Sequence, residues 1–257
     1  MEYHRQGTGK PLLLVHGLGG SRRSWDPIVG RLAATRELIL VDLPGHGGTP
    51  AEGDSGTFAG LARSLDAWLG AQGLAGVDMV GSSMGARLVL EMARRGKAGA
   101  VVSLDPGGFW AGWERHWVSA TLRASGGALR LGRPALRLLA HTAAGRTALL
   151  AQLSARPWAL DGDLVERELK ALAATRTFDA LVSDLAYGPP QDGPAHPEGG
   201  PVTIGWGRHD RLCLPSQARR AQAAFPSARL HWFDGSGHFP MWDEPEEAAA
   251  LILRAAA

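Results

Sequence analysis

A serine enclosed by two glycines, in Gly81-Ser82-Ser83-Met84-Gly85, is the pattern in this sequence with the clearest chemical meaning. An apolar run over residues 77–82 leads into it, and a segment of helical pattern follows from Met84. In that context the glycines keep side chains out of a sharp turn, which lifts the central hydroxyl clear of a strand and places it at a helix N-terminus. The pattern predicts Ser83, rather than Ser82, as a nucleophile. Without its flanking strand and helix, the same pattern would simply be small residues filling a tight turn.

A serine hydroxyl is a poor nucleophile near pH 7 and needs a positioned base. Of the nine histidines, His238 lies in the glycine-rich loop Gly235-Ser-Gly-His238, ahead of the last predicted helix. Where a serine occupies such a turn, the chain order is serine, then acid, then histidine. We therefore predict His238 as the base, although a lone histidine is often only a loop residue with satisfied hydrogen bonds.

Asp210 is the predicted acid because it lies just beyond the end of a predicted strand, in Trp206-Gly-Arg-His-Asp210. A carboxylate there can accept the Nδ1–H of His238, which fixes the tautomer and stabilises the imidazolium. The simpler interpretation of Asp210 is a solvated turn residue, and Asp105, which ends the preceding strand, is a specific rival. Asp210 is preferred because the acid conventionally follows the strand nearer the histidine. The adjacent His209 is assigned no role.

Acyl transfer also needs hydrogen-bond donors for the oxyanion that develops on the substrate. The loop His16-Gly-Leu-Gly-Gly20 follows the first apolar run and is flexible enough to present a backbone N–H. We predict the backbone amides of Leu18 and Met84 as the two donors. By itself the loop could be an ordinary glycine turn.

The elements that must position these residues alternate between short apolar runs and longer segments of helical periodicity, which is typical of a sheet with crossover helices. Runs such as Leu12-Leu-Leu-Val15 are nearly all apolar, as in parallel strands that are buried on both faces. The predicted strands are Pro11–His16, Glu37–Asp42, Val77–Ser82, Ala100–Asp105, Pro201–Trp206 and Ala228–Phe233. The predicted helices are Ser24–Arg36, Phe58–Gln72, Met84–Arg95, Pro215–Phe225 and Glu244–Arg254.

The alternation stops between Gly107 and Gly200, where helical periodicity continues without a convincing strand and ends in a segment rich in Gly and Pro. We expect residues 1–107 and 201–257 to form one core, with residues 108–200 inserted as a helical lid over the carboxyl edge of the sheet.

Composition narrows the class of protein. The chain has 257 residues, 45% of them hydrophobic, which suits a soluble domain with a sizeable core. A net charge of +2 argues against general binding of nucleic acid or another polyanion. The single cysteine excludes an internal disulfide and offers no metal cluster. The short polar start and the lack of an apolar run of roughly 18 to 20 residues predict a cytoplasmic protein without a membrane span, although an exported protein without its leader would look the same.

Together with Val41-Asp-Leu-Pro-Gly-His-Gly47, these motifs resemble the α/β-hydrolase superfamily, specifically its lidded, esterase-like branch. The resemblance runs from about residue 10 to the C-terminus. It implies an α/β fold with a mostly parallel sheet flanked by helices, and a Ser83–His238–Asp210 triad. Asp42 and His46 match the structural loop after the second strand. Superfamily members that use Asp as nucleophile, the dehalogenases and epoxide hydrolases, are disfavoured because this turn carries Ser. Ala86 departs from the Gly of many esterases at that position, which affects the space beneath the turn and not the mechanism.

The predicted lid carries two groups of residues with a bearing on the substrate. Trp110, Trp113 and Trp117 have helical spacing and would line an acyl or aryl pocket, or equally would pack the lid onto the core. Seven arginines fall in a stretch with Glu114 as its only acid, and they either attract an anionic or carrier-linked acyl substrate or are solvated helix faces. They are Arg115, Arg123, Arg130, Arg133, Arg137, Arg146 and Arg156.

The resulting prediction is a serine hydrolase that cleaves an ester-type bond of a small to medium, apolar or aromatic substrate through an acyl-enzyme, with no metal or organic cofactor. The same triad supports carbon–carbon bond hydrolysis, perhydrolysis or lyase chemistry, and a non-catalytic binding protein could retain the pocket. The natural substrate, the choice among ester, thioester, lactone and carbon–carbon bonds, the pathway and the oligomeric state are left open by the sequence.

Overall fold

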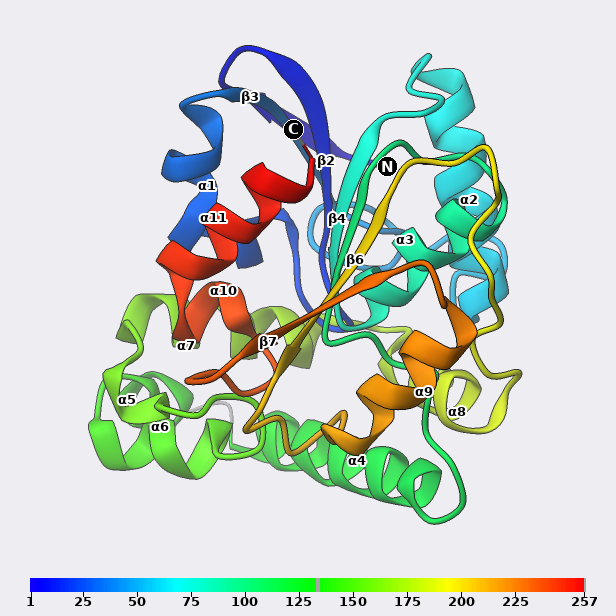
Figure 1. Cartoon of the computed structure of the whole chain (residues 1–257). Helices are drawn as coiled ribbons and strands as arrows, with labels where there is room; N and C mark the ends of the chain where they lie inside the picture. The colour runs from blue at the N-terminus through cyan, green and yellow to red at the C-terminus, as the bar shows by residue number, and fades with distance from the viewer. Residues whose placement is uncertain (133–134, 257) are drawn as a thin grey trace.

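The apolar runs of the sequence form a seven-stranded sheet in a computed structural model that describes residues 1–132 and 135–256. The strands lie in the order β1-β3-β2-β4-β5-β6-β7, and all neighbours are parallel except β1 and β3 (Figure 1). The strands are β1 (Tyr3–Gln6), β2 (Lys10–Val15), β3 (Arg36–Val41), β4 (Asp78–Ser82), β5 (Val101–Leu104), β6 (Val202–Gly207) and β7 (Arg229–Phe233). The α/β class and the six predicted strands are confirmed.

Burial on both faces explains why the central strands are so apolar. In β2, Leu13 and Val15 join one hydrophobic cluster while Leu12 and Leu14 join another on the opposite face. Successive side chains of a strand point to opposite faces, so a strand covered by helices on both sides needs an apolar residue at every position. The parallel register pairs Leu12 with Leu38 and Val15 with Val41, which aligns the two patterns.

Helices cover the two faces and one edge of this sheet. Helices α2 and α3 pack on the face that carries Leu13, and α1 and α11 pack on the other (Figure 1). The bounds are η1 (Arg22–Trp25, 3₁₀), α1 (Asp26–Ala33), α2 (Phe58–Ala71), α3 (Met84–Arg94), α9 (Ser216–Ala224), α10 (Pro240–Asp243) and α11 (Pro245–Ala255). Among the described residues, no helix combines the length and the apolar composition needed to cross a membrane.

Two differences from the predicted elements have simple causes. The edge strand β1 escaped prediction because all four of its side chains are exposed, so it has no apolar pattern. The helix expected over Ser24–Arg36 is divided into η1 and α1 and ends at Ala33. It ends early because Arg36 already starts β3 and its buried guanidinium pairs with Asp78.

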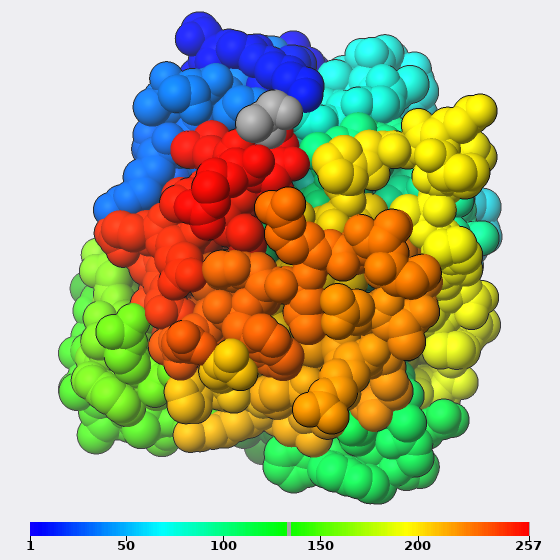
Figure 2. Space-filling view, in the orientation of Figure 1, coloured from blue at the N-terminus to red at the C-terminus, as the bar shows by residue number. Residues whose placement is uncertain are grey.

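Between β5 and β6 the chain is helical, and no strand occurs in the described part of that segment. Figure 1 shows α4 to α7 grouped beyond one end of the sheet, and in Figure 2 the same green segment lies against the orange and red C-terminal part of the chain. These elements are α4 (Glu114–Leu131), α5 (Leu136–Ala140), α6 (Ala143–Leu150), η3 (Pro157–Ala159, 3₁₀), α7 (Gly162–Ala174) and α8 (Phe178–Tyr187).

Candidate active site

Ser83 lies in the turn between β4 and α3, in a backbone conformation that few non-glycine residues adopt. Its φ is 56° and its ψ is −116°, which costs on the order of 1–3 kcal/mol and persists only where surrounding structure enforces it. Two backbone hydrogen bonds hold it: its N–H donates to Leu104 O at 2.9 Å, and its carbonyl accepts from Arg87 N at 3.1 Å. The turn therefore fixes the direction of the Ser83 hydroxyl.

The two flanking glycines are required by close backbone approaches. A Cβ on Gly81 would lie 2.2 Å from Gly85 O, and a Cβ on Gly85 would lie 2.2 Å from Val15 O. Both distances are far shorter than a carbon–oxygen contact allows, and neither opposing atom belongs to a side chain that can move away. The pattern Gly-x-Ser-x-Gly therefore has a steric basis in this chain.

Three side chains from distant parts of the chain form one hydrogen-bonded series. The Ser83 Oγ lies 2.8 Å from His238 Nε2, and His238 Nδ1 lies 2.7 Å from Asp210 Oδ2. The second carboxylate oxygen of Asp210 accepts the N–H groups of Leu212 and Cys213, at 2.8 and 2.9 Å. Both carboxylate oxygens of Asp210 thus accept hydrogen bonds, so Asp210 can hold the ring of His238 in one orientation.

Asp105, the rival acid, is buried beside this series but does not bond to the histidine in the described structure. Its Oδ1 accepts the N–H of Gly207 at 2.8 Å. Burial, and then the negative charge of Asp210, raise the pKa of Asp105 well above its usual value. The raised pKa favours the neutral form of Asp105, and the geometry favours Asp210 as the partner of His238.

The loop that carries His238 is held by a second buried carboxylate, which the sequence prediction did not include. Asp243 accepts the N–H of Gly237 at 2.7 Å and the Ser154 hydroxyl at 2.5 Å. The N–H of His238 donates to Leu153 O at 2.8 Å. Because Leu153 and Ser154 follow α6, these bonds tie the histidine loop to the helical segment after β5. The sequence signal that could have indicated this role was the position of Asp243, an acid just before the last helix.

The predicted oxyanion loop lies directly against the nucleophile. A Cβ on Gly17 would lie 3.1 Å from Ser83 Cβ. The N–H groups of Leu18 and Met84 have no hydrogen-bond acceptor within residues 1–132 and 135–256, and both residues line the same pocket as Ser83. Two free amide donors beside a serine hydroxyl can stabilise negative charge on a substrate oxygen.

His16 orients this loop. Burial lowers the pKa of His16 to about 4, so its ring is neutral near pH 7. Its Nε2 accepts the N–H of Leu43 at 3.1 Å, which leaves Nδ1 as the donor to Gly17 O at 2.7 Å. The carbonyl of Gly17 and the N–H of Leu18 belong to one planar trans peptide and point in opposite directions. The bond to Gly17 therefore also fixes where the N–H of Leu18 points.

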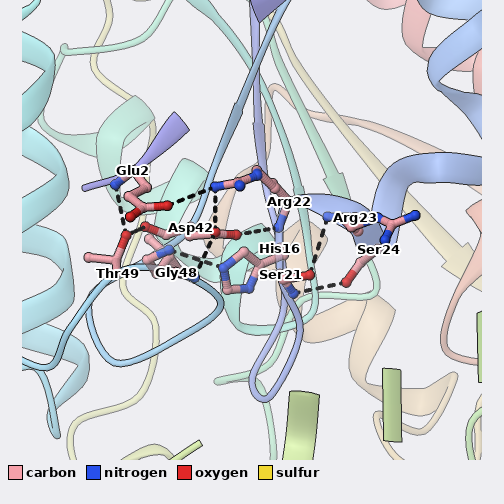
Figure 3. Close-up of polar contacts among 10 residues, drawn as sticks. Glu2, His16, Ser21, Arg22, Arg23, Ser24, Asp42, Gly48 and Thr49 are labelled. Carbon is pink, nitrogen blue, oxygen red and sulfur yellow. Dashed lines mark hydrogen bonds and ion pairs between the residues drawn. The ribbon is translucent and has the colours of Figure 1, made fainter. Parts of the chain in front are cut away.

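Asp42 and His46 are structural here, in keeping with the resemblance. The Asp42 carboxylate accepts the backbone N–H of Arg22 at 2.7 Å and of Gly48 at 2.9 Å, and pairs with the Arg22 guanidinium (Figure 3). Burial, then the neighbouring His16, lower the pKa of His46 to about 3. These contacts fasten the loop after β3 to η1.

Ser83 and His238 open into a pocket of about 890 Å³, its mouth included. Its wall combines residues of the sheet edge with residues of α4, α6, α7 and α8, and is mostly aliphatic. Examples from the helical segment are Leu122, Leu150, Leu169, Leu172 and Leu185.

The three tryptophans predicted to line the pocket, Trp110, Trp113 and Trp117, lie in different surroundings. Trp110 precedes α4 and lines the pocket, whereas Trp113 and Trp117 are 63% and 40% exposed and pack edge to face on each other. The prediction that they share one helix face fails because α4 begins only at Glu114.

The arginine-rich stretch lies outside the pocket wall. Arg130 pairs with Asp179, and Arg123, Arg146 and Arg156 donate to backbone carbonyls. None of the six described arginines lines the pocket; the seventh, Arg133, lies outside the described residues.

Two side-chain groups of the described residues have ligand types suited to a metal ion. Asp210, Cys213 and His238 place one ligand atom each within 4.8 Å of one another, but both ring nitrogens of His238 already have hydrogen-bond partners. His141, Asp163 and Glu166 form the other group, on the surface of α7 and the turn after α5.

Comparison with known proteins agrees with this fold. A family model described as "Alpha/beta hydrolase family" matches residues 12–251. A pimeloyl-[acyl-carrier protein] methyl ester esterase of Aromatoleum aromaticum is 28% identical over 94% of this chain and 96% of its own. A 2-hydroxy-6-oxononadienedioate/2-hydroxy-6-oxononatrienedioate hydrolase of Dechloromonas aromatica is 25% identical over 98% and 89%.

Among solved structures, a thermophilic esterase from Thermogutta terrifontis superposes with a TM-score of 0.76, at 19% identity, over 98% of this chain and 91% of that chain. At that identity the superposition supports the fold alone. The family model, which spans nearly the whole chain, decides the assignment: this protein belongs to the alpha/beta hydrolase family.

Proposed function

We propose that this hydrolase is a serine esterase, with Ser83 as nucleophile, His238 as general base and Asp210 as the acid that orients it. The observation that carries the proposal is the hydrogen-bonded series Ser83 Oγ–His238 Nε2 and His238 Nδ1–Asp210 Oδ2, at 2.8 and 2.7 Å. A base within this distance of a hydroxyl can take its proton as the hydroxyl attacks.

The proposed reaction has two halves. His238 Nε2 takes the proton of Ser83 as Oγ bonds to the ester carbon, and the carbonyl oxygen collects negative charge between the amides of Leu18 and Met84. His238 then protonates the leaving alcohol, and the acyl group remains on Ser83. Water, deprotonated by His238, attacks the acyl-enzyme and releases the acid.

The apolar wall of the pocket, which includes the aromatic residues Trp110, Phe239 and Trp242, supports a small to medium apolar or aromatic substrate. We further propose that residues 108–200 form a cap. Support comes from the four helices of that segment that contribute to the pocket wall, and from the bond between Leu153 and the histidine loop.

An anionic or carrier-linked acyl substrate would meet the arginines only on the outer surface, because none of those described lines the pocket. If such attraction operates, kcat/KM for an anionic ester should fall with added salt while that for a neutral ester of equal length does not. If added salt changes kcat/KM equally for both esters, the proposal of an anionic or carrier-linked substrate should be dropped.

Carbon–carbon bond hydrolysis is the second candidate, since this fold and triad do not fix the bond that is cleaved. The relative named as a 2-hydroxy-6-oxononadienedioate hydrolase supports keeping it. The hydrolysis rates of p-nitrophenyl esters and of vinylogous diketones separate the two candidates. Faster cleavage of the esters favours the esterase, and faster cleavage of the diketones favours the carbon–carbon bond hydrolase.

Covalent labelling with a fluorophosphonate tests for a working nucleophile. Wild-type protein should be labelled, and Ser83→Ala should not be. Ser82→Ala is a matched control: Ser82 is buried, adjacent, and its Oγ has no hydrogen-bond partner in the described structure. Labelling that survives in Ser83→Ala would mean that another residue is the nucleophile. A wild type that is not labelled would exclude the mechanism and favour a binding protein.

A further inference from the structure

The pocket wall contains a polar position that the reaction does not use. Apart from Ser83 and His238, the only charged or hydroxyl-bearing side chains that line it, within the described residues, are Ser24 and Glu168. The remaining lining consists of glycines, apolar side chains and Cys213.

Glu168 lies on the buried face of α7, where an acid is unexpected. Leu164, Val165 and Leu169 share that face, and Glu168 itself is 8% exposed. One of its oxygens, Oε2, accepts the Ser24 hydroxyl at 2.6 Å. Ser24 Oγ in turn accepts the N–H of Ser21 at 3.1 Å, which fixes the position of the hydroxyl beside Glu168.

The other carboxyl oxygen of Glu168, Oε1, is buried and has no hydrogen-bond partner in the described structure. A buried polar atom left unpaired costs about 1–3 kcal/mol, which a ligand group can recover. Because the residue lines the substrate pocket, the substrate is the natural source of a partner.

The charge state of Glu168 limits what that partner can be. Burial raises the pKa of Glu168 to about 7, against the opposing effects of the Ser24 hydrogen bond and Arg167. The other charged groups that act on it are Asp26, which pairs with Arg167, and Arg23; none of the three lines the pocket. Near neutral pH, Glu168 is thus present both as an acid that donates and as a carboxylate that accepts.

We propose that Glu168, held by Ser24, binds a hydroxyl group of the substrate, so that the preferred substrates are esters that carry a hydroxyl group. A hydroxyl donates and accepts, and therefore matches both forms of Glu168. A carboxylate would be repelled by the ionised form, and an ammonium group would lose its hydration in an aliphatic pocket. This inference rests on the proposed esterase function.

The test compares matched esters, with and without a terminal hydroxyl, in two series: one with the hydroxyl on the acyl chain and one with it on the alcohol chain. In the wild type, kcat/KM should favour the hydroxylated ester by about tenfold in one series, the effect of one buried hydrogen bond. Glu168→Leu should abolish the preference, and Glu168→Gln should retain it, since an amide also donates and accepts.

Glu166→Gln is the matched control, because Glu166 lies on the same helix but pairs with Lys170 and His141 outside the pocket. Fluorophosphonate labelling of Ser83 verifies that each variant is folded, and Ser24→Ala, which should weaken the preference, replaces Glu168→Leu if that variant does not fold. A wild type without the preference in either series, or a preference that survives the loss of the Glu168 carboxyl, overturns the inference. An absence of all ester hydrolysis instead overturns the proposed function.

Discussion

The carboxyl edge of the sheet and the helical wall that faces it contribute to one pocket by different physical means. At the sheet edge the positions are set by backbone contacts: Gly81 and Gly85 lie against carbonyl oxygens, and Ser83 is held at a positive φ. The facing wall is lined by residues of helices such as Leu122 in α4 and Leu172 in α7.

This difference predicts that the helical wall tolerates amino-acid substitutions better than the sheet edge does. A position where an added Cβ would lie 2.2 Å from a backbone oxygen admits only glycine, whereas an apolar wall accepts another side chain of similar volume. Chemistry should therefore be lost by small substitutions at the sheet edge, and specificity should be altered by substitutions in the wall. The predictions below test this contrast, from the largest expected effect to the smallest.

The two buried acids near His238 should respond very differently to the same change. Asp210→Asn removes the carboxylate that holds the Nδ1–H and should lower kcat about 10⁴-fold. Asp105→Asn should cost less than about tenfold, because an amide resembles the neutral carboxyl that burial favours there. Steady-state kinetics on one p-nitrophenyl ester measure both. Equal losses would mean that the two carboxyls act as one unit.

Gly85→Ala should destabilise the fold by about 3 kcal/mol or more, since its Cβ would overlap Val15 O and no side chain can yield. Gly70→Ala, in α2 with nothing within 4 Å of the new Cβ, should instead stabilise by about 0.5–1 kcal/mol. Urea denaturation gives both free energies of unfolding. A tolerated Gly85→Ala would contradict the steric account of the turn.

His16→Ala should lower kcat about ten- to a hundredfold with little change in KM, because the N–H of Leu18 would no longer be oriented by the bond to Gly17. Loss of an oxyanion donor costs about 10²–10³ in kcat, and misalignment should cost less. His209→Ala, at an exposed histidine next to Asp210, should leave kcat unchanged. If KM rises instead while kcat is kept, His16 shapes binding rather than the oxyanion site.

In the wall, Glu168→Gln should change how stability depends on pH. With its pKa raised to about 7 in the folded state, Glu168 supports the fold fully below about pH 4.5, and that support is lost as the pH rises through about 7. Between about pH 4.5 and 7, the free energy of unfolding of the variant should therefore rise relative to that of the wild type, by on the order of 3 kcal/mol. His16 and His46, with lowered pKa values, titrate in both proteins and cancel in the difference. Parallel stability curves from chemical denaturation would mean that Glu168 titrates normally.

Sequence patterns anticipated the sheet edge better than the wall. The six strands β2 to β7 and the turn around Ser83 were predictable, because both follow from local periodicity and steric rules. Asp243 and Glu168 were missed. Glu168 had a readable signal, an acid between Leu164 and Leu172 on an apolar helical face, but nothing in the sequence says that Ser24 lies opposite.

The sequence by itself determined the α/β alternation and the glycine-bound turn, because both depend on neighbouring residues. The order of serine, acid and histidine could be read from it only through the resemblance to a known architecture. Only the tertiary structure placed Asp210, and not Asp105, against His238, brought Trp110 but not Trp113 or Trp117 to the pocket, and set Glu168 against Ser24. Those outcomes depend on contacts between segments separated by up to 144 residues, whose relative placement results from packing of the whole chain.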